Sequence, residues 1–167
     1  MSISPVVSHR PASDIAGEAA LELLLLRVGG ERFALPLAAV DEAVEFEAVE
    51  LMDDAMPGGQ VLGVLPLRGA LLPVFRPDAV LHAAVQGSTP LVVILRGGDD
   101  RIGLQVDDVD DVIVVAHDAA RPSPIVAALR ERTPVVGVIR HDAGIVTLLD
   151  AAAIVASCSA GVLEAAR

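Results

Sequence analysis

The stretch RFALPLAAVDEAV at residues 32–44 decides the fold, because the chain repeats it as RIGLQVDDVDDVI at residues 101–113. The two copies align without a gap, from Arg32 with Arg101 to Val44 with Ile113. A second stretch, GVLPLRGALLPVF at residues 63–75, is echoed later in the chain by GVIRHDAGIVTLL at residues 137–149. One unit therefore occurs twice in the same internal order. Solenoid repeats are shorter and more numerous, so this repeat predicts a pair of small barrels or sheets, with function in the seam between them.

Short apolar runs separated by turn residues indicate an all-β fold with short helices. The runs at residues 61–67 and 70–75 are joined by Arg68 and Gly69, which predicts a hairpin with a tight turn. Glycine can supply a positive φ there at no steric cost. Two repeats of about five such strands each predict two linked five-stranded barrels.

The repeat and the local composition divide the chain into parts. Residues 1–19 are small, polar and Pro-containing, which predicts a mobile N-terminal tail. The repeat divides the folded part of the chain, which begins near residue 20, into approximate barrel halves at residues 20–88 and 89–150. Residues 150–167 are expected to form a C-terminal helix and tail.

Composition limits the class of protein. Hydrophobic residues make up 53% of the 167, yet no window approaches the roughly 18 uncharged apolar residues of a membrane span. The N-terminus lacks a basic region followed by an apolar one, so no secretory signal is expected. The lone Cys158 fits a reducing cytosol. A net charge of −11 and 2% aromatic residues disfavour nucleic-acid binding, which depends on phosphate neutralisation and base stacking.

At residues 63–75 the chain resembles the CheW-like domain family of bacterial chemosensory signalling. The family has a stretch close to Gly-hydrophobic-x-x-Leu-Arg-Gly-x-hydrophobic-x-Pro-Val, which this chain meets with Gly63, Leu67, Arg68, Gly69, Pro73 and Val74. Other family segments follow in the same order at residues 24–43, 101–113, 121–124 and 135–155. The resemblance covers about residues 20–156, nearly everything but the tails.

The resemblance implies two five-stranded SH3-like barrels on a shared apolar core, in agreement with the repeat. It implies a non-enzymatic adaptor, without cofactor or metal, that couples transmembrane chemoreceptors to the histidine kinase CheA. The cytoplasmic signalling tip of the receptor is expected in the groove between the barrels. The regulatory domain of the kinase, which has the same fold, is expected at the barrel ends. Such a protein is cytoplasmic and can be recruited to receptor arrays without inserting into the membrane.

Three places depart from the family pattern. Family members often have Asn where Pro66 stands, and usually an Asp in the stretch occupied by Arg76 and Pro77. Ala43 replaces a larger apolar residue. These departures concern receptor binding more than the fold. They indicate, as an alternative within the same class, an adaptor of another chemosensory array or of a pilus-type pathway.

Five residues are candidates for protein contacts. The resemblance assigns Gly63, Arg68 and Gly69 from one motif, and Val40 and Glu42 from its Val-x-Glu. A rigid turn would present the Arg68 guanidinium to carbonyls or carboxylates of a partner. Val40 and Glu42 lie two positions apart, so a regular strand would place them on one face. The alternatives are that Arg68 only braces its turn against a local acid, that Val40 is core and that Glu42 is solvated.

Other patterns give no catalytic or metal site. The four acids Asp107, Asp108, Asp110 and Asp111 lack the glycine and terminal Glu of a calcium loop, so a solvated acidic turn is expected. Cys158 and the four histidines form no metal-spaced pair, and Cys158 is expected in the core. The chain contains no nucleophile-elbow, P-loop or complete dinucleotide motif. Outside the adaptor class, a small-barrel nucleic-acid-binding protein is the alternative.

Overall fold

The computed structural model describes residues 20–52, 61–119, 134–142 and 144–165, whose strands form two sheets. The first sheet has the order β10 (Val135–His141), β11 (Gly144–Leu149), β2 (Glu31–Pro36), β1 (Ala20–Val28) and β9 (Asp108–Ala116). The second has the order β3 (Val40–Glu45), β7 (Leu91–Gly97), β8 (Asp100–Val106), β6 (Ala70–Phe75), β5 (Val61–Leu67) and β4 (Glu50–Leu51). The remaining elements of the described chain are η2 (Leu37–Ala39), η3 (Phe46–Ala48), α2 (Pro77–Leu81) and α4 (Ala151–Ala165).

This architecture confirms the predicted class, a mostly β fold with two barrel-like sheets and a C-terminal helix. The second sheet has six strands instead of five, because the two-residue β4 adds to its edge. Asp150 caps α4 by accepting a hydrogen bond from the Ala153 N–H at 3.0 Å. The tail predicted at residues 1–19 lies outside the described residues. No helix in the described part of the chain is long and apolar enough to cross a membrane.

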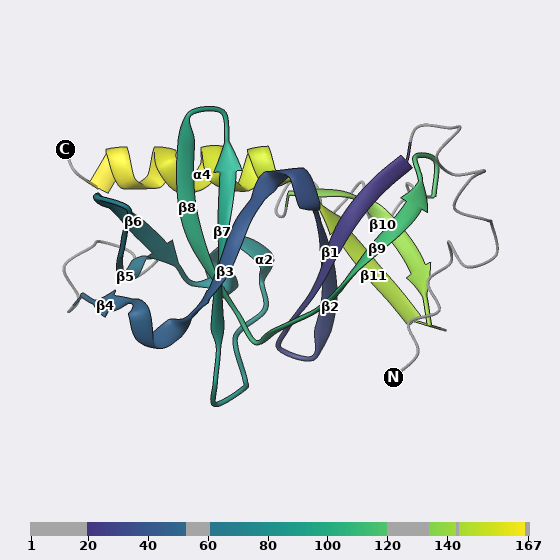
Figure 1. Ribbon diagram of the computed structural model, residues 1–167, viewed down its shortest axis with the longest axis horizontal. Coiled ribbons are helices and arrows are strands. Elements are labelled where there is room, and N and C mark those ends of the chain that lie inside the picture. The colour runs from purple at the N-terminus through teal and green to yellow at the C-terminus, as the bar shows by residue number, and fades with distance from the viewer. Residues whose placement is uncertain (1–19, 53–60, 120–133, 143, 166–167) are drawn as a thin grey trace.

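The duplication of the sequence is also a duplication of strand pairing. β6 runs parallel to β8 with Val74 opposite Gly103, and β11 runs parallel to β2 with Leu148 opposite Ala34. The repeat relates the two pairs, because Val74 aligns with Leu148 and Ala34 aligns with Gly103. Equivalent turns point to opposite sides of the molecule, the β1–β2 turn at the bottom of Figure 1 and the β7–β8 turn at the top.

The two copies do not fold as separate sheets, so the predicted halves at residues 20–88 and 89–150 are wrong as spatial units. β1 and β2, from the first copy, share a sheet with β9, β10 and β11 from the second. β3 to β6, from the first copy, share the other sheet with β7 and β8 (Figure 1). The repeat shows that the two units are alike. It does not show that the first hairpin of each unit pairs with the remaining strands of the other unit.

One apolar cluster joins the two sheets and α4. This shared cluster includes Leu26 and Leu35 from the first sheet, Phe75 and Leu104 from the second, and Ile154 from α4, each at most 1% exposed. α4 lies across β7 and β8 (Figure 1). Since burying one such side chain contributes about 1.5–3 kcal/mol, the shared cluster holds the two sheets together, as predicted. A smaller second-sheet cluster lies inside the second sheet and consists of Val49, Leu65, Val74, Val92 and Ile94.

Candidate protein-binding site

Arg68 and Gly69 form the two-residue turn between β5 and β6, as predicted. Leu67 lies opposite Ala70, and the φ angles of the two turn residues are 49° and 82°. Positive φ at both central positions gives the turn whose twist suits a β-hairpin. Glycine adopts it freely, whereas the left-handed region costs a residue such as Arg68 about 1–2 kcal/mol. The hairpin therefore imposes this conformation on the arginine.

The Arg68 side chain reaches β3 and pairs with Glu42. Arg68 Nη2 donates to Glu42 Oε2 at 2.8 Å, while the arginine side chain stays 69% exposed. An exposed ion pair contributes about 0.2–1 kcal/mol, so this contact adds little to stability. Its effect is to fix the orientation of the Arg68 guanidinium, which is otherwise open to solvent. Two of the candidate residues thus form one exposed charged site.

A β-bulge at Asp41 separates Val40 from Glu42, so the expectation that they share a face is wrong. Val40 lies opposite Leu95, whereas Glu42 lies opposite Ile94, the next residue along β7. Neighbouring residues of a strand point to opposite faces. Val40 accordingly packs against the shared cluster, and Glu42 lies on the face of the second-sheet cluster. One extra residue is enough to change the alternation.

The Arg68–Glu42 pair joins two distant parts of the second sheet. β3 is one edge of this sheet, and β5 is next to the other edge. Val44 of β3 and Leu67 and Leu72 of the β5–β6 hairpin pack against the same second-sheet cluster. The sheet is therefore curled into a barrel, and the ion pair lies where its two sides meet.

Gly63 and Val40 face inward, and we therefore leave them out of the exposed site. Gly63 is buried opposite Leu51 of β4, and a methyl group on its Cα would collide with the Glu50 carbonyl. Because Gly63 has no side chain, β4 can pack closely against β5 at this position. The part of the predicted site that a partner can reach is Arg68, Gly69 and Glu42.

A groove of about 490 Å³ opens where the two sheets meet. Its lining includes Pro36 and Leu149 from the first sheet, Arg96 and Gly97 from the second, and Ala151 at the start of α4. A groove between the barrels was expected as the receptor site, and binding of a receptor there stays a prediction. Arg68 and Glu42 do not line it, so the exposed charged site and the groove are separate features.

Asp107 holds the segment after α2 against the β1–β2 turn, an arrangement that the sequence did not reveal. Its carboxylate accepts hydrogen bonds from the backbone N–H groups of Gly29 at 2.6 Å, Gln86 at 2.8 Å and Gly87. Partial burial raises the pKa of Asp107, but the three donors and the charge of Arg27 together lower it more, so this pKa lies below its ordinary value. Asp107 is a structural anchor and not simply part of a solvated acidic turn.

Asp107→Asn is expected to lower the free energy of unfolding by roughly 1–2 kcal/mol at neutral pH, because the amide keeps only one acceptor oxygen for three donors. The folded pKa lies below the reference value of 3.8, so the carboxylate's extra stabilisation is complete above that value. It disappears as the pH falls through the lower folded pKa. Urea denaturation of both proteins over a pH series measures the difference, and a difference that persists unchanged into strong acid contradicts the assignment.

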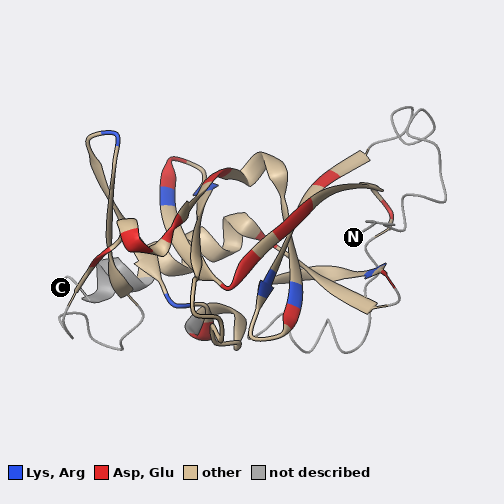
Figure 2. Ribbon diagram, turned by 60° about the horizontal axis from the view of Figure 1, so that its bottom comes forward, with Lys and Arg blue, Asp and Glu red and all other residues tan. Residues whose placement is uncertain are grey.

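The other three acids of this segment also have partners within the chain. Asp108 and Asp110 lie 2.9 and 3.1 Å from Arg27, and Asp111 accepts the N–H of Val112 at 2.6 Å. Figure 2 shows acidic residues following one another along β9. Among the residues that the structure describes, no three His, Cys, Asp or Glu side chains are grouped to hold a metal ion.

Cys158 is buried on α4 within the shared cluster, as expected. Burial raises the pKa of its thiol to about 12. The side chain is therefore a protonated, apolar group at neutral pH and not a nucleophile.

The sequence model of the CheW-like domain matches residues 22–159. The chain belongs to the CheW-like family. It is 30% identical over 131 residues to the chemotaxis protein CheW of Rhizobium meliloti (strain 1021), covering 77% of this chain and 83% of that protein. It is 29% identical over 117 residues to the chemotaxis protein CheW of Klebsiella aerogenes, covering 67% and 68%.

A solved CheW-like structure has the same fold. The crystal structure of the scaffolding protein TtCheW from Thermoanaerobacter tengcongensis superposes with a TM-score of 0.69. The match covers 87% of this chain and 90% of that one at 19% identity. At this identity the likeness concerns the fold alone, and it extends over both sheets of the family architecture.

Proposed function

We propose that this protein is a non-enzymatic adaptor that couples chemoreceptors to a CheA-type histidine kinase in a bacterial chemosensory array. Membership of the CheW-like family across residues 22–159 carries the proposal. The partners are the regulatory domain of the kinase and the cytoplasmic signalling tip of a receptor. The protein would then work in the cytoplasm, at the membrane-bound array.

The chemistry of the described residues suits contact better than catalysis. The sulfur of Cys158 is a buried thiol, and the acids of β9 are paired with Arg27 or with backbone N–H groups. The exposed charged site, by contrast, holds a guanidinium on a rigid turn. Planar guanidinium groups bind carboxylates and carbonyls with defined geometry. The nucleic-acid alternative is not favoured, because a net charge of −11 repels phosphates.

Reconstitution from purified components tests the adaptor function. The protein is mixed with the CheA-type kinase of the same genome and with vesicles carrying a chemoreceptor signalling domain. We expect it to sediment with the vesicles, to bring the kinase with it, and to raise kinase autophosphorylation only when all three are present. Failure to bind either partner contradicts the proposal, and retention on heparin at physiological salt would support the nucleic-acid alternative instead.

The second candidate function is that of an adaptor for an array other than that of ordinary chemotaxis receptors, and one observation favours it. Pro66, at a position where the family often has Asn, lies directly opposite Leu71 on the hairpin that bears Arg68. Both residues are exposed, and Leu71 is 66% exposed. The surface beside the charged site is therefore apolar, which suits an array partner with an apolar contact. Sedimentation with receptors from a chemotaxis cluster and from a pilus-type cluster distinguishes the two.

A further inference from the structure

Asp41, the extra residue of the β3 bulge, is held by two arginines. Its carboxylate lies 2.7 Å from Arg96 Nε and 3.4 Å from Arg101 Nη1, and its side chain is 16% exposed. Arg96 also donates from Nη2 to the carbonyl of Ala38 at 2.7 Å. Arg96 and Arg101 lie directly opposite each other on β7 and β8, where like charges repel. The Asp41 carboxylate offsets this repulsion, so bulge and arginines stabilise one another.

The bulge determines which face of β3 carries Glu42. If β3 paired regularly from Val40 opposite Leu95, with Asp41 opposite Ile94 and no bulge, Glu42 would lie opposite Val93. Val93 is fully buried in the shared cluster, and an unpaired carboxylate there is strongly unfavourable. The bulge instead places Glu42 opposite Ile94, on the face from which it reaches Arg68 at 2.8 Å. The exposed charged site therefore depends on the bulge.

The second copy of the repeat contains the same bulge and the same ion pair. On β9 the extra residue is Asp110, and Arg27 Nε lies 3.1 Å from its carboxylate. In the alignment of the copies, Arg27 corresponds to Arg96 and Asp110 corresponds to Asp41. The residue after this second bulge, Asp111, accepts a neighbouring backbone N–H and forms no ion pair with a described residue. The bulge with its Arg–Asp pair thus belongs to both copies, but among the described residues only the first copy follows it with an ion pair to a hairpin turn.

We infer that Asp41 is the positioning residue of the Arg68–Glu42 site. Held between Arg96 and Arg101, it keeps β3 bulged, and the bulge directs Glu42 to Arg68 so that a partner meets one fixed arrangement of charges. Because Asp41 is mostly buried, it acts through Glu42 and not by touching the partner. The inference rests on the proposed function only in taking this site as a partner contact.

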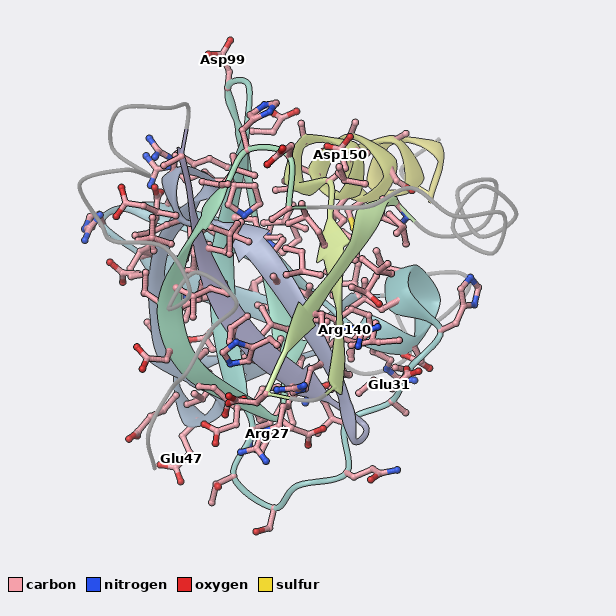
Figure 3. The ribbon with its side chains drawn as sticks, turned by 90° about the vertical axis from the view of Figure 1, so that its right-hand side faces the viewer. Arg27, Glu31, Glu47, Asp99, Arg140 and Asp150 are labelled. Atoms are coloured by element: carbon pink, nitrogen blue, oxygen red, sulfur yellow. The ribbon has the colours of Figure 1, made fainter. Side chains whose placement is uncertain are left out.

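Affinity measurements separate positioning from a general effect on folding. Asp41→Ala is expected to weaken binding of the array partner that depends on Arg68, either the receptor signalling fragment or the kinase regulatory domain, by about 5- to 10-fold in calorimetry. Asp110→Ala removes the equivalent contact of the other copy and is expected to change affinity by less than about twofold. In Figure 3, Arg27, the partner of Asp110, lies at the bottom of the view, and Asp99 in the β7–β8 turn lies at the top.

A double-mutant comparison adds a readout that a purely structural role would not move. In the Arg68→Ala background, Asp41→Ala is expected to cause no further loss of affinity, because the site that it positions is already gone. A full additional loss there, or an equal loss with Asp110→Ala, overturns the inference.

A crystal structure of the Asp41→Ala variant tests the inference without any partner. We expect Glu42 to lose its contact with Arg68, through loss of the bulge or through rotation of the side chain. An unchanged contact overturns the inference. If the wild-type protein bound neither partner, the proposed function would fail, and this structure would still decide the role of Asp41.

Discussion

Arg68→Glu is expected to weaken partner binding by about 30-fold or more, a loss of roughly 2 kcal/mol of binding free energy. The substitution replaces a group with five N–H donors by an acceptor and places a second negative charge beside Glu42. Since the Arg68 side chain is 69% exposed, the free energy of unfolding should change by less than about 1 kcal/mol. Calorimetric titration with the kinase regulatory domain and with the receptor fragment measures the affinity, and urea denaturation checks the fold.

The charge-swapped double variant Glu42→Arg with Arg68→Glu is the matched control. It restores an ion pair between the hairpin turn and β3, but it reverses the charges that a partner meets. If Arg68 binds the partner, affinity stays low in the double variant. Recovery of wild-type affinity would mean that Arg68 only braces the turn, and it would remove this residue from the contact site.

Local features of this fold could be predicted from sequence because they depend on neighbouring residues. The turn at Arg68 and Gly69 needs two positive φ angles, and an Arg-Gly step between two apolar runs indicates it. The burial of Cys158 follows from an apolar helix face in the same way. The pairing of Arg68 with Glu42, which lies 26 residues earlier in the chain, was not predicted. It depends on the curvature of a six-stranded sheet, which no short pattern encodes.

The Arg–Asp pairs at the two bulges each join one copy of the repeat to the other, Arg96 with Asp41 and Arg27 with Asp110. Aligning the copies places Arg27 with Arg96 and Asp41 with Asp110, in the same gapless register as the rest of the repeat. The alignment could therefore have marked these four residues as a repeated feature. It could not show that Arg27 pairs with Asp110 of the other copy and Arg96 with Asp41, because strand exchange determines the partners. The bulge was missed for a related reason, since strict alternation was assumed where ion pairs stabilise an extra residue.

Phe75→Ala is expected to lower the free energy of unfolding by about 3–5 kcal/mol. Phe75 is 1% exposed at the end of β6, opposite Leu104 of the parallel strand β8, and belongs to the cluster that both sheets share. Removing its ring leaves a cavity in the shared cluster, which also contains Leu35 of β2. Both sheets should therefore lose stability together and unfold in one transition. Because the chain has no Trp or Tyr, far-ultraviolet circular dichroism in urea is the suitable measurement.

Hydrogen exchange followed by mass spectrometry resolves the two sheets in the same variant. We expect faster exchange in β1 and β2 as well as in β6 and β8, because their most protected amides open only when the shared cluster opens. Leu71→Ala is the control, since Leu71 lies on the same strand but is 66% exposed and should cost less than about 1 kcal/mol. Loss of protection confined to the second sheet would show that each barrel is stable alone. In that case the exchange of the first hairpins between the two copies would not make the two sheets one cooperative unit.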